Sequence, residues 1–235
     1  EALKYSRHYV SGFTDDGYCS EGVGYWNYGF GHYVILAESI LKATHGKINL
    51  FNDSKVKSMS EFSRNIEIIN GVCPAFADCD IKARPMSSLV KYISYRYGST
   101  DNYDNFNFDS ELFYCIAVSF PEKADPPDLP DEKEDRLRSW FDIAGILICR
   151  PAKDSSCRIG AALKGGNNAE LHNHNDIGSY VIVQTKEPII LDPGGEVYTA
   201  RTFSSKRYDS NLLNSFGHPV PVIAGQLQKT GKEAC

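Results

Sequence analysis

The sequence lacks any apolar run close to the ~20 residues that a membrane-spanning helix requires. Its beginning, EALKYSRHYV, also lacks the apolar core and the small-residue cleavage site of a secretory signal peptide. The chain starts in a charged, Tyr-rich stretch and closes on QLQKTGKEAC, soon after an apolar strand-like segment. We therefore expect no membrane span, and we expect the chain to be a piece of a longer protein.

An excess of positive charge is missing as well. The 25 Lys and Arg residues against 30 Asp and Glu residues give a formal charge of -5, which argues against nucleic acid as a partner. An acidic substrate would therefore need a local positive site, and a bound metal cation could help to supply one. The seven cysteines are an odd number without a CxxC pair, so we expect free thiols with at most one pair, not a disulfide framework.

Apolar residues, by contrast, are plentiful. The 235 residues include 42% hydrophobic side chains, enough for a packed core in one large domain or two small ones. In the first half these residues recur with helical spacing, and Asp53 or Ser54 is the expected N-cap of one helix, with Gly71 just past its end. The predicted helices run from Tyr33 to about Gly46 and over 54–69, 87–97 and 110–120.

The second half has a different pattern. Its first stretch, PEKADPPDLPDEKED, holds four prolines and nine charged residues with one leucine, which predicts a linker. Short apolar runs bounded by Gly, Pro, Asn and Asp predict strands at 141–149, 179–184, 188–191 and 219–223. Helices followed by strands indicate an α+β multidomain chain, with a helical part at 1–120, an acidic Pro-rich linker at 121–136 and an antiparallel sheet or sandwich at 137–235.

Histidines gather in this second half. Three of the six fall between 172 and 218, and two of them, His172 and His174, stand two residues apart. In an extended chain such residues project to the same face, so both imidazoles can address one pocket. Asp192 and His218 offer further ligands at the edges of apolar runs. Imidazole plus carboxylate suits a divalent transition metal, most simply Zn²⁺.

Closing this site requires a turn. A hairpin turning near Lys186 would leave Asp192 about 23 Å of extended chain from His174, so residues 175–178 must fold back. Other interpretations stay open: the histidines could be surface or structural groups, and Asp192 could serve the turn chemistry of Asp-Pro-Gly.

Aromatic residues and glycines crowd residues 15–29, DDGYCSEGVGYWNYG, just before a predicted helix. Aromatic faces such as that of Trp26 can carry pyranose rings, and a phenol such as that of Tyr25 can donate or accept a proton. Tyr25 and Tyr28 would share a face if the helix starts this early. The alternative is that these rings only pack the start of the helix.

Together these motifs resemble the heparinase II/III-like polysaccharide lyases, a family that includes alginate and oligoalginate lyases. The resemblance implies the C-terminal part of an (α/α) toroid followed by an antiparallel β-sandwich. It rests on stretches from both halves of the chain, in the family's order: DGYCSEGVGYWNYG at 16–29, GVCPAFADCD at 71–80, WFDIAGILICR at 140–150, LHNHNDIGSYVI at 171–182, LDPGGEVYTARTF at 191–203 and NSFGHPVPVI at 214–223.

The resemblance also implies three groups of site residues. The catalytic groups are Tyr25, His172 and, in a looser motif, Tyr208. A structural metal, Zn²⁺ or another divalent ion, falls on His174, Asp192 and His218. The expected substrate contacts are Glu21, Trp26 and Arg201.

The implied reaction is β-elimination on a polysaccharide that contains uronic acid. Tyrosine has a reference pKa of about 10, so Tyr25 suits the acid that protonates the leaving oxygen. Histidine titrates near neutrality, so His172 suits the base or charge stabiliser. The alternative is a catalytically inactive carbohydrate-binding module of the same fold.

The full-length protein is expected to be periplasmic or secreted, and a dimer is compatible with the sequence. Asp78 and Asp80 are expected to serve a turn after Pro74.

Overall fold

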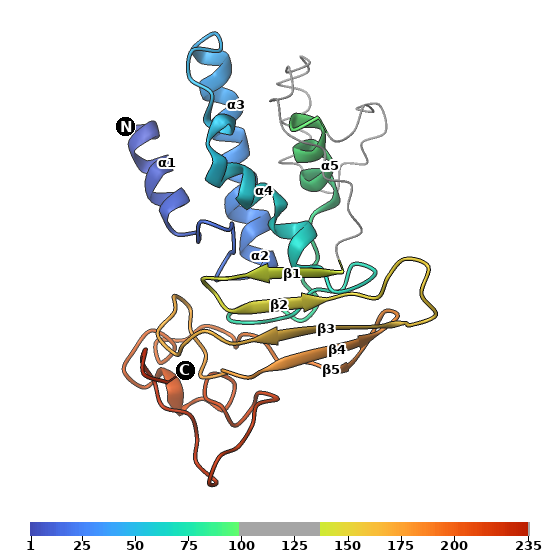
Figure 1. Cartoon of the computed structure of the whole chain (residues 1–235). Coiled ribbons are helices and arrows are strands. Elements are labelled where there is room, and N and C mark those ends of the chain that lie inside the picture. Colours follow the sequence, from blue (N-terminus) through green and yellow to red (C-terminus); the bar gives the residue numbers. More distant parts are fainter. Residues whose placement is uncertain (99–136, 235) are drawn as a thin grey trace.

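The computed structural model describes residues 1–98 and 137–234, in which helices precede a single sheet (Figure 1). The helices are α1 (Ala2–Ser11), α2 (Val23–Tyr25), α3 (Gly31–Ala43), α4 (Ser54–Ile66) and α5 (Ser87–Arg96), with a π-helical turn at Trp26–Phe30. The strands are β1 (Arg138–Phe141), β2 (Ile146–Cys149), β3 (Ile159–Lys164), β4 (Tyr180–Gln184) and β5 (Glu187–Ile190). The helix predicted at 110–120 and the linker predicted at 121–136 lie outside the described residues. None of the described helices has the length and apolar character that crossing a membrane requires.

The prediction for α4 is confirmed at its start and wrong at its end. Asp53 is the N-cap, with its carboxylate accepting the backbone N–H of Lys55 at 2.9 Å. The helix ends at Ile66 instead of residue 69, because the chain reverses in a tight turn. There the backbone N–H of Ile68 donates to the carbonyl of Val72 at 2.7 Å. Such a turn takes these residues out of helical geometry.

The five strands form one antiparallel sheet in the order β1-β2-β3-β4-β5. The hairpin predicted near Lys186 is confirmed, since Gln184 pairs with Glu187. The single strand predicted at 141–149 is wrong, because Phe141 pairs with Ile146 and the run divides into a hairpin of two strands. The strand predicted at 219–223 is also wrong. Proline has no N–H for a ladder, and this segment, PVPVI, makes only an isolated bridge between Ile223 and Gln226.

One face of the sheet packs on the helices and belongs to their hydrophobic core. The ring of Phe141 lies 5.9 Å from that of Phe62 on α4 and 5.2 Å from that of Tyr18. The other face exposes large apolar side chains, among them Trp140 at 55% and Leu163 at 44%. Helices on one face of an antiparallel sheet make the described residues an α+β fold, as predicted.

Candidate active site

The centre of the site is the carboxylate of Asp78, in the loop between α4 and α5. Its side chain is fully buried and accepts hydrogen bonds from both halves of the chain: His172 Nδ1 at 3.0 Å, His174 Nε2 at 3.0 Å, Tyr198 Oη at 3.0 Å and Arg207 at 3.2 Å. Burial acts to raise the pKa of Asp78, but the hydrogen bonds from the two histidines and the Arg207 charge outweigh it and lower the pKa below its usual range. Asp78 is therefore an ionised anchor for the groups around it.

Glycines allow the loop that carries Asp78 to lie close to two other segments. A Cβ on Gly194 would come 2.1 Å from the carbonyl oxygen of Cys79, and Gly195 donates its N–H to that same oxygen at 3.1 Å. On the other side, a Cβ on Gly22 would lie 2.5 Å from the Cβ of Cys79. Gly22 and Gly194 have φ near +80° and +70°, a region that favours glycine. These contacts bring the aromatic motif and the Asp-Pro-Gly-Gly turn to Asp78.

His172 lies between two carboxylates. Its Nδ1 contacts Asp78, and its Nε2 lies 2.6 Å from Glu21 Oε1, where both His172 and Glu21 are about one third exposed. The hydrogen bond to Asp78 raises the pKa of His172. The extended conformation predicted for 172–174 is wrong, because His172 has φ +56° and stands in a turn. The two imidazoles still meet one carboxylate, and a left-handed non-glycine residue at such a site is held by its surroundings.

Tyr25 completes the site from the helical half. It lies just before the π-helical turn, a feature that is frequent at functional sites. Its side chain is 39% exposed, and its hydroxyl donates to Tyr198 Oη at 3.3 Å. Tyr198 in turn donates to Asp78, and burial, the contact with Tyr25 and the Asp78 charge raise the pKa of Tyr198. Tyr198 thus stays protonated and connects the Tyr25 phenol to the Asp78 carboxylate.

A cavity of about 690 Å³ opens beside Glu21 and Tyr25. It lies among the loop before α2, the helices α1 and α3, and Leu171, the neighbour of His172. Its lining is rich in aromatic side chains: Tyr5, Tyr9, Phe13, Tyr25, Tyr28 and Tyr33. Such a surface suits the faces of sugar rings, as the aromatic motif predicts.

The other predicted contacts have different surroundings. Trp26 is completely buried, with its indole N–H donating to the Met59 carbonyl at 2.8 Å, so the prediction that it touches substrate is wrong. Its ring stacks in the core, which is the alternative that the motif left open. Arg201 pairs with Glu196 at 2.6 Å. The Tyr208 hydroxyl accepts a hydrogen bond from Asn173 at 3.1 Å, next to His172 in the chain.

Behind His172 lies a buried cluster that fits a metal ion. His174, Asp176 and His218 each offer one ligand atom, and these atoms lie within 4.8 Å of one another. His174 Nδ1, Asp176 Oδ2 and His218 Nε2 are buried without a hydrogen-bond partner in the described part of the chain. Leaving such atoms unpaired costs free energy, and a divalent cation would be a partner for all three. Two imidazoles and a carboxylate are a donor set that Zn²⁺ accepts.

The remaining contacts orient these groups. His174 points its other ring nitrogen at Asp78, and His218 Nδ1 lies 2.9 Å from Asp192 Oδ2. A metal-ligating histidine commonly donates its second N–H to a carboxylate in this way. Asp192 also accepts from the Ser179 hydroxyl at 2.6 Å and from the Gly194 N–H at 3.0 Å. Asp192 thus uses its carboxylate to position His218, whereas Asp176 has a free oxygen.

The turn that the predicted site required is present. The N–H of Ser179 donates to the carbonyl of Asp176 at 2.9 Å, and Gly178 has φ +84°. The chain therefore folds back, and the rings of His174 and His218 lie 5.2 Å apart. Asp192 reaches this cluster directly, at His218 Nδ1, and also holds Ser179, and a bulge between Ile182 and Val183 shifts the register of the hairpin that precedes it. 

Three residues of the site were not predicted from the sequence: Asp78, Asp176 and Tyr198. Asp78 lies in a turn, as expected, but also organises the site. The one signal for it was its place in GVCPAFADCD, a stretch that resembles the lyase family. Asp176 and Tyr198 lie in two other such stretches, LHNHNDIGSYVI and LDPGGEVYTARTF, but the sequence predicted only a turn at Asp176 and no role for Tyr198.

The comparisons with known proteins concern the fold. No family model and no curated relative matches the sequence. A solved heparinase III with methylated lysines superposes with a TM-score of 0.63 at 17% identity, covering 97% of this chain and 33% of the other. Another heparinase III gives a TM-score of 0.55 at 13% identity, with 97% and 35% covered. The heparan sulfate lyase HepC from Pedobacter heparinus gives 0.51 at 16% identity, with 85% and 28% covered. The resemblance is confirmed for the fold, and the chain spans about a third of the length of these proteins.

Proposed function

We propose that the protein to which this chain belongs is a polysaccharide lyase that cleaves a uronic-acid-containing polysaccharide by β-elimination. One observation carries the proposal: Asp78 connects His172 directly, and Tyr25 through Tyr198, at the edge of an aromatic cavity. Two groups that can exchange protons therefore lie at one space that suits sugar rings: Tyr25 lines it, and His172 contacts Glu21, which lines it. The names of the solved neighbours, heparinase III and heparan sulfate lyase, make heparan sulfate the first substrate to test.

The proposed reaction needs one base and one acid. The base removes the proton at C5 of the uronate, and the electron pair of that C–H bond forms the C4–C5 double bond. The C4–O bond breaks with its electrons staying on the oxygen, which takes up a proton. We assign the base or charge-stabilising role to His172 and the acid role to Tyr25, whose phenol is half-exposed at the cavity.

Asp78 acts in this scheme as a positioning residue. It holds His172 by Nδ1, so that Nε2 is the nitrogen that contacts Glu21, and Glu21 lines the cavity. Glu21 is one third exposed and can move aside when a sugar binds. Orientation of an imidazole by a buried carboxylate is a common arrangement for proton transfer.

We further propose that a divalent metal, most simply Zn²⁺, is held by His174, Asp176 and His218 with Asp192 orienting His218. When bound, the ion supplies structural cross-linking of the segment that carries His172. Its ligand atoms are buried, which suits a structural ion better than a hydrolytic one with an open coordination position.

The wider fold is also part of the proposal. The helices are taken as the C-terminal part of an (α/α) toroid and the sheet as one layer of a β-sandwich. The exposed apolar face with Trp140 and Leu163 supports the second idea, because a sandwich buries such a face. A polymeric acidic substrate implies a periplasmic or secreted full-length protein.

The test is the ultraviolet absorbance of the unsaturated product, measured with heparan sulfate, heparin, chondroitin sulfate and alginate on the full-length protein. The proposal predicts growth of that absorbance on at least one substrate and its loss in His172→Ala. Saturable binding of a substrate without any product would instead identify a carbohydrate-binding protein of the same fold. Product formation that survives in His172→Ala would overturn the residue assignment.

A further inference from the structure

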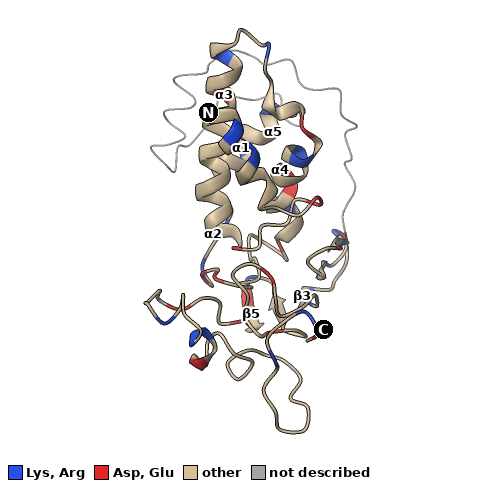
Figure 2. Cartoon of the chain, turned by 90° about the vertical axis from the view of Figure 1, so that its left-hand side faces the viewer, with Lys and Arg blue, Asp and Glu red and all other residues tan. Residues whose placement is uncertain are grey.

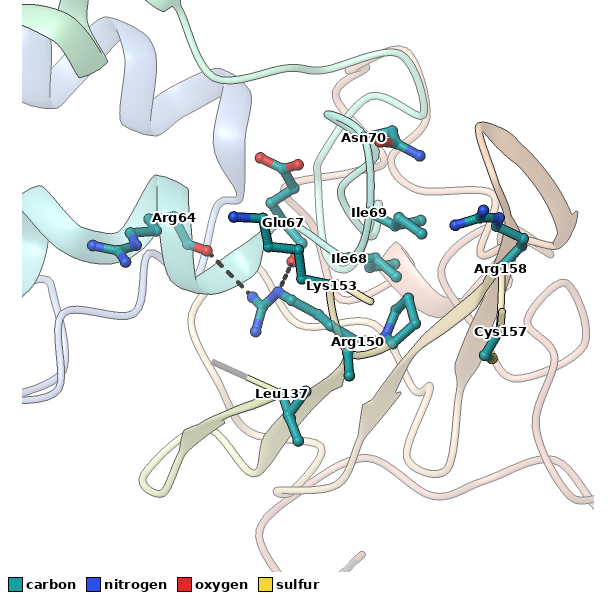
Figure 3. A pocket seen from close by; sticks show the side chains of 12 residues that line it. Arg64, Glu67, Ile68, Ile69, Asn70, Leu137, Arg150, Lys153, Cys157 and Arg158 are labelled. Carbon is teal, nitrogen blue, oxygen red and sulfur yellow. Dashed lines mark hydrogen bonds between the residues drawn. The ribbon is translucent and has the colours of Figure 1, made fainter. Parts of the chain in front are cut away.

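A second cavity, of about 440 Å³, lies between the end of α4 and the ends of β2 and β3 (Figure 3). Arg158 lines this cavity just before β3 begins, whereas Lys164 at the other end of β3 contacts Asp176 in the metal cluster. Six residues of strand span about 20 Å. The second cavity and the candidate active site are therefore separate and lie toward opposite ends of one strand.

The lining of the second cavity is cationic in a chain whose formal charge is -5. Its four basic side chains are Arg64, Arg150, Lys153 and Arg158. Among the described residues, Glu67 is the one carboxylate in the lining, and it accepts the backbone N–H of Gly71 at 2.8 Å. Figure 3 shows Arg150 and Lys153 between Arg64 on the α4 side and Arg158 on the strand side. Four cations against one acid make this a local positive site.

Arg150 is the fixed part of the site. Its guanidinium donates to the carbonyls of Asn65 at 2.7 Å and Glu67 at 2.8 Å, and to the Ser139 hydroxyl at 2.8 Å. Figure 3 shows the bond to Glu67 and a further one to the carbonyl of Arg64 at 3.2 Å. These carbonyls belong to the end of α4, where a cation is favourable. Arg150 thus stabilises the junction of helix and sheet and holds its charge in a set position.

The other three cations are available to a ligand. Arg64, Lys153 and Arg158 are exposed, and in the described ranges no carboxylate forms an ion pair with any of them. In the candidate active site the arginines are already engaged, Arg201 with Glu196 and Arg207 with Asp78. The second cavity is therefore lined by three cations, Arg64, Lys153 and Arg158, whose charge is not used by a carboxylate of the described residues.

We propose that the cavity formed by Arg64, Arg150, Lys153 and Arg158 is an accessory site for the sulfate or carboxylate groups of an acidic saccharide chain. That the ligand is a saccharide rests on the proposed function, while the recognition of anions rests on the cavity itself. An acidic polymer held here stays tethered to the protein between cleavage events, at the opposite end of β3 from the active site. Binding at two linked sites raises the effective concentration of the second contact.

The test measures binding to the His172→Ala variant, so it does not depend on lyase activity. The probes are sulfated maltotetraose, tetragalacturonate and neutral maltotetraose, titrated calorimetrically into the chain with His172→Ala. The test variant is Arg64→Gln/Lys153→Gln/Arg158→Gln. The control, Lys4→Gln/Arg7→Gln/Lys47→Gln, removes the same charge from the helical part, where α1 carries basic residues (Figure 2).

We expect at least one anionic probe to bind and the neutral probe not to bind. The test variant should bind about tenfold more weakly, with a smaller difference at high salt, while the control binds as the parent does. The two anionic probes distinguish sulfate from carboxylate recognition. Absence of binding by both anionic probes, or an equal loss in the test and control variants, would overturn the proposal.

Cys157 provides an independent readout of position. It lines the cavity and its side chain is exposed. A bound saccharide should slow its alkylation by iodoacetamide, measured by mass spectrometry on the peptide that contains Cys157. If an anionic probe binds but leaves that rate unchanged, the saccharide binds elsewhere and the assignment of this cavity is wrong.

Discussion

The buried carboxylate of Asp78 lies 3.0 Å from the Nδ1 of His172, although 94 residues separate the two in the chain. Asp78 comes from the loop between two helices, and His172 follows a strand of the sheet. Their contact joins the two halves at the point where the chemistry is proposed to occur. The predictions below test this contact and the groups around it.

Replacing Asp78 by Asn tests whether Asp78 positions His172 for the reaction without contributing to substrate binding. The amide cannot accept from His172, His174 and Arg207 together, so we expect kcat to fall about 10²-fold or more while KM changes little. The free energy of unfolding should fall by about 2–4 kcal/mol, because buried cationic partners lose their anion. Steady-state kinetics and urea unfolding measure both effects. The control is Asp80→Asn, at an exposed residue of the same loop, and an equal effect of the two substitutions would contradict the role of Asp78.

Removing the hydroxyl of Tyr25 should remove the acid. We expect Tyr25→Phe to lower kcat about 10²- to 10⁴-fold, since general acid catalysis contributes that much. Stability should change little, because this phenol is half-exposed and makes one hydrogen bond at 3.3 Å. Tyr28→Phe, three residues further along and 69% exposed, is the matched control. Normal turnover by Tyr25→Phe would assign the acid to another group.

Metal content and melting temperature should change together. We expect about one divalent ion per chain by elemental analysis, and a lower melting temperature after treatment with a chelator. Asp176→Asn should abolish binding of the ion, whereas Asp192→Asn should weaken it about 10- to 100-fold, as is typical when the carboxylate partner of a ligand is lost. If Asp192→Asn abolished metal binding and Asp176→Asn only weakened it, Asp192 would be the ligand, as the sequence predicted.

Glu196 should make stability depend on pH. Its side chain is 8% exposed, and although burial acts to raise its pKa, hydrogen bonds from Ser210, Thr202 and Arg201 lower it. A carboxylate with a lowered pKa stabilises the fold above its unfolded pKa of about 4.3, and this stability is lost as pH falls through the folded pKa.

We therefore expect Glu196→Gln to lower the free energy of unfolding by about 1–3 kcal/mol at neutral pH, and the difference from the parent to shrink below about pH 4. Urea unfolding across this pH range measures it, with the exposed Glu187→Gln as control. If the difference in unfolding free energy between the parent and Glu196→Gln did not change with pH, the stabilisation would not depend on the charge of the Glu196 carboxylate.

Local patterns in the sequence predicted much of the fold. Apolar periodicity and a capping residue identified α3 and α5 closely and the start of α4, and the hairpin at Lys186 followed from turn chemistry. The errors arose where tertiary contacts override local pattern. The run 141–149 was predicted as one strand although it contains Asp142 and Gly145, two typical turn residues, and the chain reverses between them, with Gly145 at φ +65°.

The site was predictable in its residue types and less so in its geometry. His172 and His174 meet at Asp78, and His174 lies beside His218, but a turn at His172 and a fold-back at 175–178 produce these contacts instead of an extended strand. Whether Asp176 or Asp192 is the metal ligand depends on which of them has a carboxylate oxygen without a hydrogen-bond partner. The spacing of the two residues in the sequence does not reveal that. The motif at 15–29 also did not show that Trp26 is buried while Tyr25, the residue before it, is exposed.

The most direct test of the central claim is the mass of the products formed from a heparan sulfate oligosaccharide in water enriched in heavy oxygen, using the full-length protein. β-Elimination breaks the C4–O bond without adding water, so the two products should together have the mass of the substrate, with no heavy oxygen incorporated during cleavage and one carrying the new double bond. Incorporation of one heavy oxygen per cut would mean hydrolysis and would contradict the account.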